Sequence, residues 1–322
     1  GYTGLTKYYD TWYYVEQGRL NWGYTGLTNY YGTWYYVEQG RLNWGYTGLT
    51  KYYDTWYYVE QGRLNWGYTG LTNYYGTWYY VAQGILNWNY SGIVQWNNEN
   101  WRVTNGVATE KVASHIVCID AGHQQAGISE QEPNGPGSSV MKAKLTTGTS
   151  GVATGLAEYQ LNLDVSQMLQ QELLNRGYQV VMIRTTNDCA MSNAERAVYA
   201  NESGAEIFVR IHANSSNDPS VNGAMFYAPS SANSYLSADV ISASNTLAST
   251  MLSFYCSTTG LANKGVLQDD NMTGINWCTI PVTIVEMGFM SNPEEDQKMA
   301  NPEFQAVIAQ GLANGIDAYF GR

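Results

Sequence analysis

The sequence is poor in basic residues. Its 322 residues include 16 Lys and Arg against 27 Asp and Glu, which gives a formal net charge of −11. Residues 1–88 contain as many basic as acidic residues, so the whole excess of negative charge belongs to the rest of the chain. This balance argues against nucleic-acid binding through phosphate contacts, and also against electrostatic docking to an anionic membrane.

Long apolar runs are missing as well. No stretch approaches the roughly 20 apolar residues that a transmembrane helix needs, so we expect no membrane span. No signal peptide is present either. Because the chain opens at the start of a repeat, we expect it to belong to a longer secreted protein.

Cysteine and histidine are both scarce. The spacings of the four cysteines, Cys118, Cys189, Cys256 and Cys278, fit no zinc-knuckle pattern. Cys118 lies inside an apolar run and is most simply a small buried hydrophobic residue. Only three histidines occur, and two of them end apolar runs, which makes their positions informative.

The first third of the chain is a repeat array. Residues 1–22, 23–44, 45–66 and 67–88 are four copies of one 22-residue unit, and the first and third copies are identical. A fifth, degenerate copy runs from Asn89 to Glu110. Self-similarity at a fixed period indicates stacked units instead of an ordinary globular core. We therefore predict one domain over residues 1–110 and a second over residues 111–322.

Each full unit contains two β-rich runs around a tight turn. In the first unit, Leu5–Tyr9 and Thr11–Val15 bracket Asp10, which predicts one β-hairpin per repeat. Because a lone hairpin is marginal in water, the hairpins must stack to bury their rings. Seven aromatic residues per unit exceed what one hairpin can hide, so some rings should stay exposed on a regular face. Such rings suit stacking on sugars or holding a quaternary ammonium group.

The repeat unit resembles the choline-binding-type cell-wall repeats of Gram-positive surface proteins and phage lysins. The resemblance rests on the pattern Gly-Leu-Thr-x-Tyr-Tyr-x-Thr-Trp-Tyr-Tyr-Val-x-x-Gly and covers residues 1–110. It implies a ligand held between aromatic residues of consecutive repeats, either a choline-like group or another cell-wall polymer. It also implies that the protein is secreted and associated with the cell wall.

The second part of the chain alternates short apolar runs with helical patterns. The predicted strands are Ile116–Ile119, Tyr178–Ile183, Ile207–Ile211 and Val282–Val285. The predicted helices begin at Glu158, at the capping box Ser192–Glu195, near Ser234 and near Pro302. This alternation predicts an α/β domain, with a mostly parallel sheet and helices on both faces, preceded by an all-β array of stacked hairpin repeats. Residues 124–157 are expected to form a long loop in the wall of a cleft.

Three of the predicted strands end on residues that can bind metal or move protons. They deliver His123, His212 and Glu286 to the carboxyl edge of the sheet, where folds of this class bind their ligands. Glu158 lies at the start of a predicted helix. Two histidines and one glutamate suit a hydrolytic zinc site, and the other glutamate can take a proton from the attacking water. Spacing alone leaves open which glutamate binds the metal.

Four ordered motifs in this part resemble the zinc-dependent N-acetylmuramoyl-L-alanine amidase family of the amidase-3 type. They are Cys118-Ile-Asp-Ala-Gly-His123, Glu158 at the head of a helix, Arg210-Ile-His-Ala-Asn214, and Pro281-Val-Thr-Ile-Val-Glu-Met-Gly-Phe-Met-Ser-Asn292. The resemblance covers about residues 114–322. It implies Zn²⁺ held by His123, Glu158 and His212, with Glu286 as the catalytic residue. The implied substrate is peptidoglycan, cut at the amide bond between N-acetylmuramic acid and L-alanine of the stem peptide.

Two other interpretations stay open at this point. One is a zinc peptidase that cuts within the stem peptide, and the other is a wall-binding or adhesive protein with an inactive second domain. Asn214 and Asn292 either contact substrate or satisfy a turn and a strand end. Arg210 is expected to form an ion pair.

Overall fold

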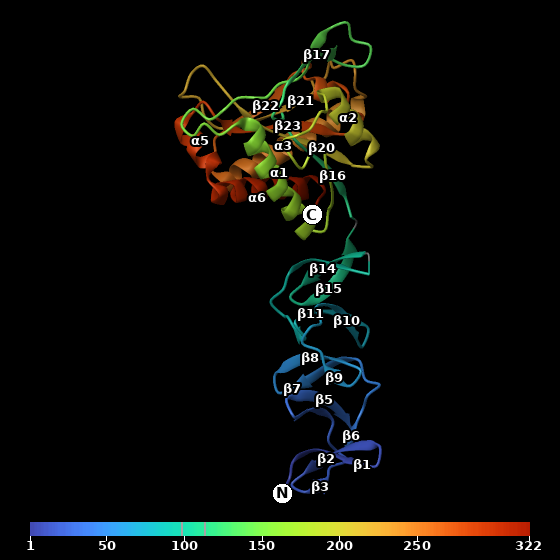
Figure 1. Ribbon diagram of the computed structural model, residues 1–322. Helices are drawn as coiled ribbons and strands as arrows, with labels where there is room; N and C mark the ends of the chain where they lie inside the picture. The colour runs from blue at the N-terminus through green and yellow to red at the C-terminus, as the bar shows by residue number, and fades with distance from the viewer. Residues whose placement is uncertain (98, 113) are drawn as a thin grey trace. The chain divides into compact units, whose positions relative to one another are not determined.

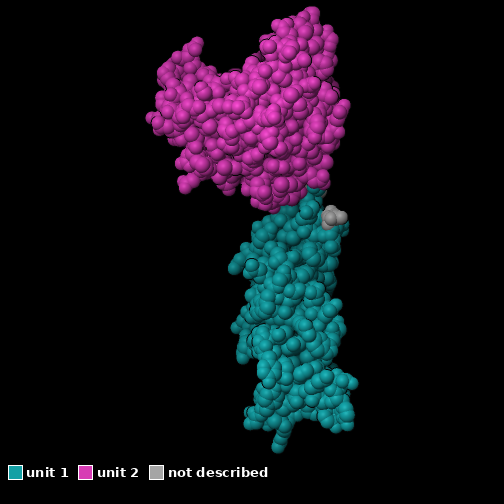
Figure 2. All heavy atoms as spheres, viewed as in Figure 1, with its two compact units in different colours: residues 1–114 teal, residues 115–322 magenta. Residues whose placement is uncertain are grey.

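The computed structural model describes residues 1–97, 99–112 and 114–322. The chain forms two compact units, Gly1–Ser114 and His115–Arg322 (Figure 2). The boundary predicted after residue 110 falls inside a strand, β15 (Val107–Val112), which pairs with both the fifth hairpin and the fourth. The fifth copy therefore continues past its sequence similarity until that strand ends.

The first unit is all-β, as the repeats predict (Figure 1). Its hairpins are β1 (Gly4–Tyr8) with β2 (Thr11–Glu16), β4 (Gly26–Tyr30) with β5 (Thr33–Glu38), β7 (Gly48–Tyr52) with β8 (Thr55–Glu60), β10 (Gly70–Tyr74) with β11 (Thr77–Ala82), and β13 (Gly92–Trp96) with β14 (Glu99–Thr104). Four short strands were not predicted: β3 (Arg19–Leu20), β6 (Arg41–Leu42), β9 (Arg63–Leu64) and β12 (Ile85–Leu86). Two residues are too few for a periodic signal, yet β6, β9 and β12 each pair with the preceding hairpin and so join consecutive repeats.

Consecutive repeats share one hydrophobic core per junction. The first such core combines Leu5 and Tyr14 of one copy with Val37 and Leu42 of the next. Burying each aliphatic side chain contributes about 1.5–3 kcal/mol, so each junction stabilises the two copies that it joins. Gly40 is required there, because a Cβ at this position would lie 2.6 Å from the carbonyl oxygen of Asn21.

Two arginines of the array lie over aromatic rings of the preceding copy. The Arg41 guanidinium lies 5.4 Å from the centre of the Trp22 ring and 5.7 Å from that of Tyr13. Arg63 repeats this arrangement over Trp44 and Tyr35. The rings attract the guanidinium groups electrostatically, so these two aromatic pairs already hold a cation supplied by the chain itself.

The second unit is a three-layer α/β domain, as predicted. Its sheet has the strand order β19 (Gln179–Met182), β16 (Ile116–Ala121), β20 (Ile207–Asn214), β23 (Val282–Phe289), β21 (Ala224–Ala228), β22 (Asn263–Gln268). All neighbours are parallel except β21 and β23. β21 and β22 were not predicted and lie at one edge of the sheet. β22 is largely polar and exposed, whereas β21 is an apolar run of five residues that the sequence did offer.

Helices cover both faces of this sheet. On one face, α1 (Glu158–Asn175), α3 (Ala238–Thr259) and α6 (Pro302–Tyr319) form the larger core (Figure 1). On the other face, α2 (Asn193–Glu202) and α4 (Thr273–Asn276) form a smaller one. A further helix, α5 (Pro293–Ala300), follows β23. The predicted helix at Ser234 begins at Ala238, because the side chain of Ser237 caps its N-terminus. Among the described residues, no helix has the length and apolar character to cross a membrane.

The prediction of an irregular loop over residues 124–157 is wrong in part. The segment contains an antiparallel hairpin of β17 (Ile128–Pro133) and β18 (Met141–Leu145). β17 is mostly polar and exposed and gives no pattern, whereas β18 alternates apolar and polar residues over Met141–Leu145, a strand signal that was too short to be recognised. Its second strand nevertheless contributes to a cavity wall, as was predicted for this segment.

Candidate metal centre and active site

His123 follows β16 and is held by a backbone hydrogen bond. Its Nδ1 lies 2.8 Å from the carbonyl oxygen of Thr146, which can only accept, so Nδ1 carries the proton. In the neutral imidazole, Nε2 then presents a lone pair to Oε1 of Glu158, 3.2 Å away. Two lone pairs that face each other at this distance require a cation between them, either a proton on the imidazole or a metal ion.

Glu158 is the first residue of α1, where a helix favours negative charge. Its carboxylate is buried and accepts hydrogen bonds from the backbone N–H groups of Thr149 (2.9 Å) and Ala213 (3.1 Å). Burial alone would raise the pKa of Glu158, but the interactions with His123 and His212 outweigh it and hold the pKa well below its usual range. The group is therefore a carboxylate at neutral pH, which is the form that binds metal.

His212 lies near the end of β20, with Nδ1 3.3 Å from Oε1 of Glu158. Burial, assisted by the positive charges of His123 and Arg210, lowers the pKa of His212 to about 4, although Glu158 opposes the shift. The imidazole is thus neutral at pH 7. Within the described part of the chain its buried Nε2 has no hydrogen-bond partner.

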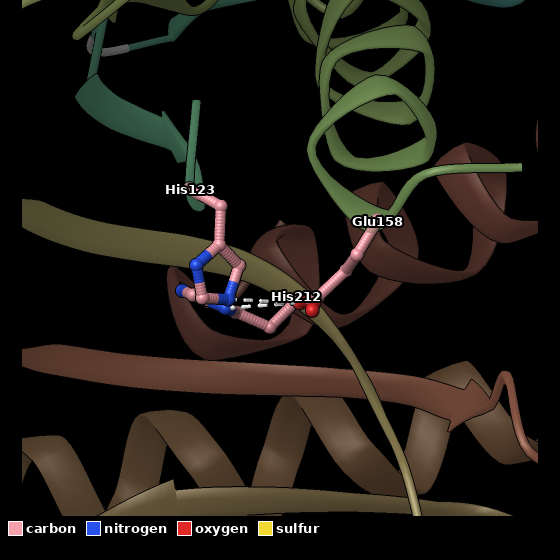
Figure 3. Close-up of side chains that lie close together, drawn as sticks. All are labelled: His123, Glu158 and His212. Carbon is pink, nitrogen blue, oxygen red and sulfur yellow. Dashed lines mark hydrogen bonds and ion pairs between the residues drawn. The ribbon is translucent and has the colours of Figure 1, made fainter. Parts of the chain in front are cut away.

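The three side chains come from separate elements and converge on one point (Figure 3). Their candidate ligand atoms all lie within 4.8 Å of one another, and the two imidazole rings lie 4.7 Å apart, nearly perpendicular. Two imidazoles and a carboxylate form the donor set of a hydrolytic zinc site. The unpartnered lone pairs and the backbone-oriented His123 ring also fit such an ion.

Glu286 lies on β23 directly beside His212, its register partner on β20. Burial, and then the negative charge of Glu158, raise the pKa of Glu286 well above its usual range. Its Oε2 is buried and has no partner among the described residues. Glu286 lines a cavity of about 410 Å³ together with His123, His212 and Arg210. The structure therefore places His123, His212 and Glu286 on the wall of one cavity, and the buried Glu158 carboxylate contacts both histidines.

A buried ion-pair network supports this site, and only the ion pair of Arg210 was predicted from the sequence. The Asp120 carboxylate accepts from Arg196 at 2.6 Å and from Arg210 at 2.9 Å, which confirms the expected ion pair of Arg210. Arg196 also donates to the carbonyl oxygens of Ala121 (3.1 Å) and His123 (3.2 Å). Together these contacts fix the turn that carries His123.

Arg184 holds the same turn from another side. It donates to the carbonyl oxygens of Ala121 at 2.6 Å and of Gly122 at 3.1 Å. Neither Arg184 nor Arg196 was identified from the sequence. For Arg196, the only available signal was that an arginine occupies a position on the buried face of α2, which indicates a buried ion pair. Gly122 has to be glycine, because a Cβ there would lie 2.3 Å from the His212 ring.

The two asparagines considered from the sequence have structural partners. Asn292 caps α5 and accepts from the backbone N–H groups of Glu294 and Glu295, both at 3.1 Å. Asn214 accepts from the N–H of Ser215 at 2.7 Å. The four cysteines, all in the described part of the chain, are free thiols.

Comparison with known families places both units. Residues 117–318 match the family model described as N-acetylmuramoyl-L-alanine amidase. Residues 1–21, 23–43, 45–65 and 67–87 each match the choline-binding repeat.

Individual relatives agree with the first of these matches. An uncharacterized protein of Bacillus subtilis, YqiI, is 28% identical over 66% of this chain and 88% of its own length. The N-acetylmuramoyl-L-alanine amidase LytC of the same organism is 26% identical over 53% of this chain, but the matched region is only 33% of LytC. The crystal structure of the N-acetylmuramyl-L-alanine amidase Ami1 from Mycobacterium smegmatis is 25% identical, with a TM-score of 0.59, over 65% of this chain and 98% of that one.

Proposed function

Since the chain belongs to the N-acetylmuramoyl-L-alanine amidase family, we propose that it is a zinc-dependent peptidoglycan amidase that works at the cell wall. The bond cut joins the lactyl group of N-acetylmuramic acid to L-alanine of the stem peptide. The observation that supports this best is the convergence of His123, Glu158 and His212 on one point, with Glu286 on the wall of the cavity that both histidines line.

We assign His123, Glu158 and His212 as the residues that hold the metal. Bound zinc supplies Lewis-acid chemistry, which polarises a carbonyl and makes a water molecule easier to deprotonate. The backbone contacts of Glu158 and the Thr146 contact of His123 orient these donors before any ion arrives. The turn held by Arg184 and Arg196 keeps His123 in place.

We assign Glu286 as the general base and then the general acid. The raised pKa makes its carboxylate a strong base for a glutamate, so it readily takes a proton from the attacking water. The protonated carboxyl then delivers that proton to the nitrogen of the leaving L-alanine. The same side chain takes up and delivers the proton, so Glu286 is sufficient for both steps.

Product analysis and metal analysis test this proposal together. Digestion of purified peptidoglycan should release whole stem peptides that carry a new L-alanine amino end, and exhaustive chelation should abolish the release. A zinc peptidase would instead expose amino ends within the stem. An undiminished rate after chelation would refute the assignment of the metal.

Histidine variants sharpen the metal assignment, because the chain provides a matched control. We expect about one zinc per chain in the wild type, and little in His123→Ala or His212→Ala. His115→Ala should keep its zinc, because His115 pairs with Glu206 at 2.9 Å and stacks on Phe320, away from the ligand set. Zinc lost equally from all three variants would contradict the assignment.

We propose that the repeats bind a cell-wall polymer or a choline-like group and hold the enzyme on its substrate. Support comes from the match of four copies to the choline-binding repeat and from the regular exposure of tryptophans along the array. Several weak sites on one chain raise the overall affinity for a polymer without any single tight site.

Deleting residues 1–88 separates targeting from catalysis. The shortened protein should bind whole cell walls at least about 100-fold more weakly, because avidity is lost. Its rate on small soluble muropeptides should not change, since the second unit has its own cores. Sedimentation with walls and a soluble-substrate assay measure the two effects. Equal losses in both assays would argue against a targeting role.

A further inference from the structure

The turn of each full repeat carries a tyrosine that is almost completely exposed. Tyr9, Tyr31, Tyr53 and Tyr75 are 82–91% exposed, whereas most other rings of the array are packed. Each has a φ of 48–52°, in the left-handed region that a bulky side chain disfavours. A large ring in solvent and an unfavourable backbone both cost stability. We name these four residues the tip tyrosines.

The fifth copy shows that the turn itself does not need tyrosine. Asn97 occupies the equivalent position with a φ of 52°, and asparagine tolerates this conformation well. The degenerate copy therefore has the residue that the backbone prefers, while all four full copies have one that it disfavours. Folding alone gives no reason for the tip tyrosines.

The rings are nevertheless held in a defined orientation. Each tip tyrosine makes an edge contact with the tyrosine before it, at 4.5–4.6 Å between ring centres. In the second to fourth copies that preceding tyrosine packs against a tryptophan of the previous hairpin, as Tyr30 does on Trp12 at 5.0 Å. The tip rings are thus anchored at one edge and free on their faces.

The chemistry of the surroundings favours a sugar over a cation. Holding a cation takes several rings around it, which the Tyr–Trp pairs of the array offer and a single tip ring does not. The first two of these pairs already contain Arg41 and Arg63, whereas Ile85 and Val107 stand in place of arginine beside the other two. A tip ring instead offers an open flat face next to a phenol hydroxyl. The C–H groups on one face of a pyranose ring suit the negative face of an aromatic ring. Residues 1–88 also have no net charge to attract an ion.

We propose that Tyr9, Tyr31, Tyr53 and Tyr75 form a row of stacking sites for pyranose rings, and that they bind the glycan strands of the wall separately from any cation site of the repeats. This inference rests on the proposed function, because the polymer that the enzyme cuts has a glycan backbone. Four equivalent sites on one array suit a polymer that is itself built of repeating units.

The test compares wild-type protein with the variant Y9N/Y31N/Y53N/Y75N in binding to purified wall glycan strands that lack stem peptides and attached polymers. The variant takes the residue of the fifth copy, so its Tm should stay equal or rise. Its affinity for the glycan, measured by titration calorimetry, should fall at least about 100-fold through lost avidity. Tyr→Phe at the same positions should retain most binding, because the ring face makes the contact.

The second turn of each copy provides the matched control. Gln17, Gln39, Gln61 and Gln83 are exposed, share the positive φ, and correspond to Asn105 in the fifth copy. The variant Q17N/Q39N/Q61N/Q83N should bind glycan as the wild type does. Unchanged binding by the tip-tyrosine variant, or complete displacement of the glycan by choline, would overturn the proposal. A wild-type protein that binds glycan through these tyrosines yet releases no stem peptides would refute the amidase function and leave the stacking row intact.

Discussion

Replacing Glu286 with glutamine is expected to lower kcat by about 100- to 10,000-fold, the usual contribution of a positioned acid–base group. The amide has the same shape as the carboxyl but cannot take up or deliver a proton. Glu286 lies beside the ligand set without belonging to it, so zinc content and wall binding should persist. Release of stem peptides, zinc content and wall sedimentation measured on one preparation check all three expectations.

The control is Glu303→Gln, which changes an exposed glutamate in the first turn of α6. It should leave the rate unchanged. If Glu286→Gln lost zinc and activity together, Glu286 would have to be reassigned as a ligand. If it kept the full activity of an active wild type, Glu286 would not be the acid–base group. If neither the wild type nor the variant released stem peptides, the interpretation of the second unit as an inactive, adhesive domain would become the better one.

Asp120→Asn is expected to destabilise the second unit by about 3–5 kcal/mol, the usual cost of removing one partner from a buried ion pair. Asp120 and Arg196 are completely buried, and Arg210 is almost so. Without the carboxylate, two guanidinium groups remain charged in an apolar setting. Because Arg196 also holds the carbonyl oxygen of His123, zinc affinity should fall together with stability.

The pH dependence of this effect has a defined sign. Burial by itself would raise the pKa of Asp120, but Arg196 and Arg210 outweigh it and hold the pKa well below its usual range. The carboxylate therefore contributes stability above its unfolded pKa of about 4, and this contribution is lost as the pH falls through the lower folded pKa. The difference in unfolding free energy between wild type and Asp120→Asn should shrink below about pH 4.

Urea unfolding at several pH values measures that difference. Asp239→Asn, an exposed change in the first turn of α3, is the control and should cost less than about 1 kcal/mol. A loss of similar size in both variants would show that the buried network adds little. Such a result would contradict the role of the Asp120 network in holding the turn that carries His123.

The sequence predicted the site better than it predicted the supports of the site. His123, His212 and Glu286 were found because each lies within or just after a strand whose apolar run is visible locally. Glu158 begins a helix with a clear apolar stripe. Arg184 and Arg196 were missed because their partners lie 62 to 76 residues away in the chain, and no local pattern reports such a contact.

The fold was predicted to a similar extent. The hairpin repeats and the alternation of strands with helices carry strong periodic signals, and both architectures are confirmed. β17, β22 and the two-residue strands were missed because they are polar or too short to show a repeating pattern. β18 and β21 do carry short strand signals, an apolar–polar alternation and an apolar run of five residues, and these were overlooked. The unusual φ of the tip tyrosines was also invisible, because tyrosine is not a residue that signals a left-handed turn.

The sharing of each core by two neighbouring copies has a consequence for how the array can evolve. A junction such as Leu5, Tyr14, Val37 and Leu42 involves only adjacent units, so an additional 22-residue block would complete one more junction of the same kind and disturb none. Unequal recombination between the identical first and third blocks could therefore lengthen or shorten the array in whole units. The number of choline-binding-type repeats could then change in whole units, while the second unit stayed the same.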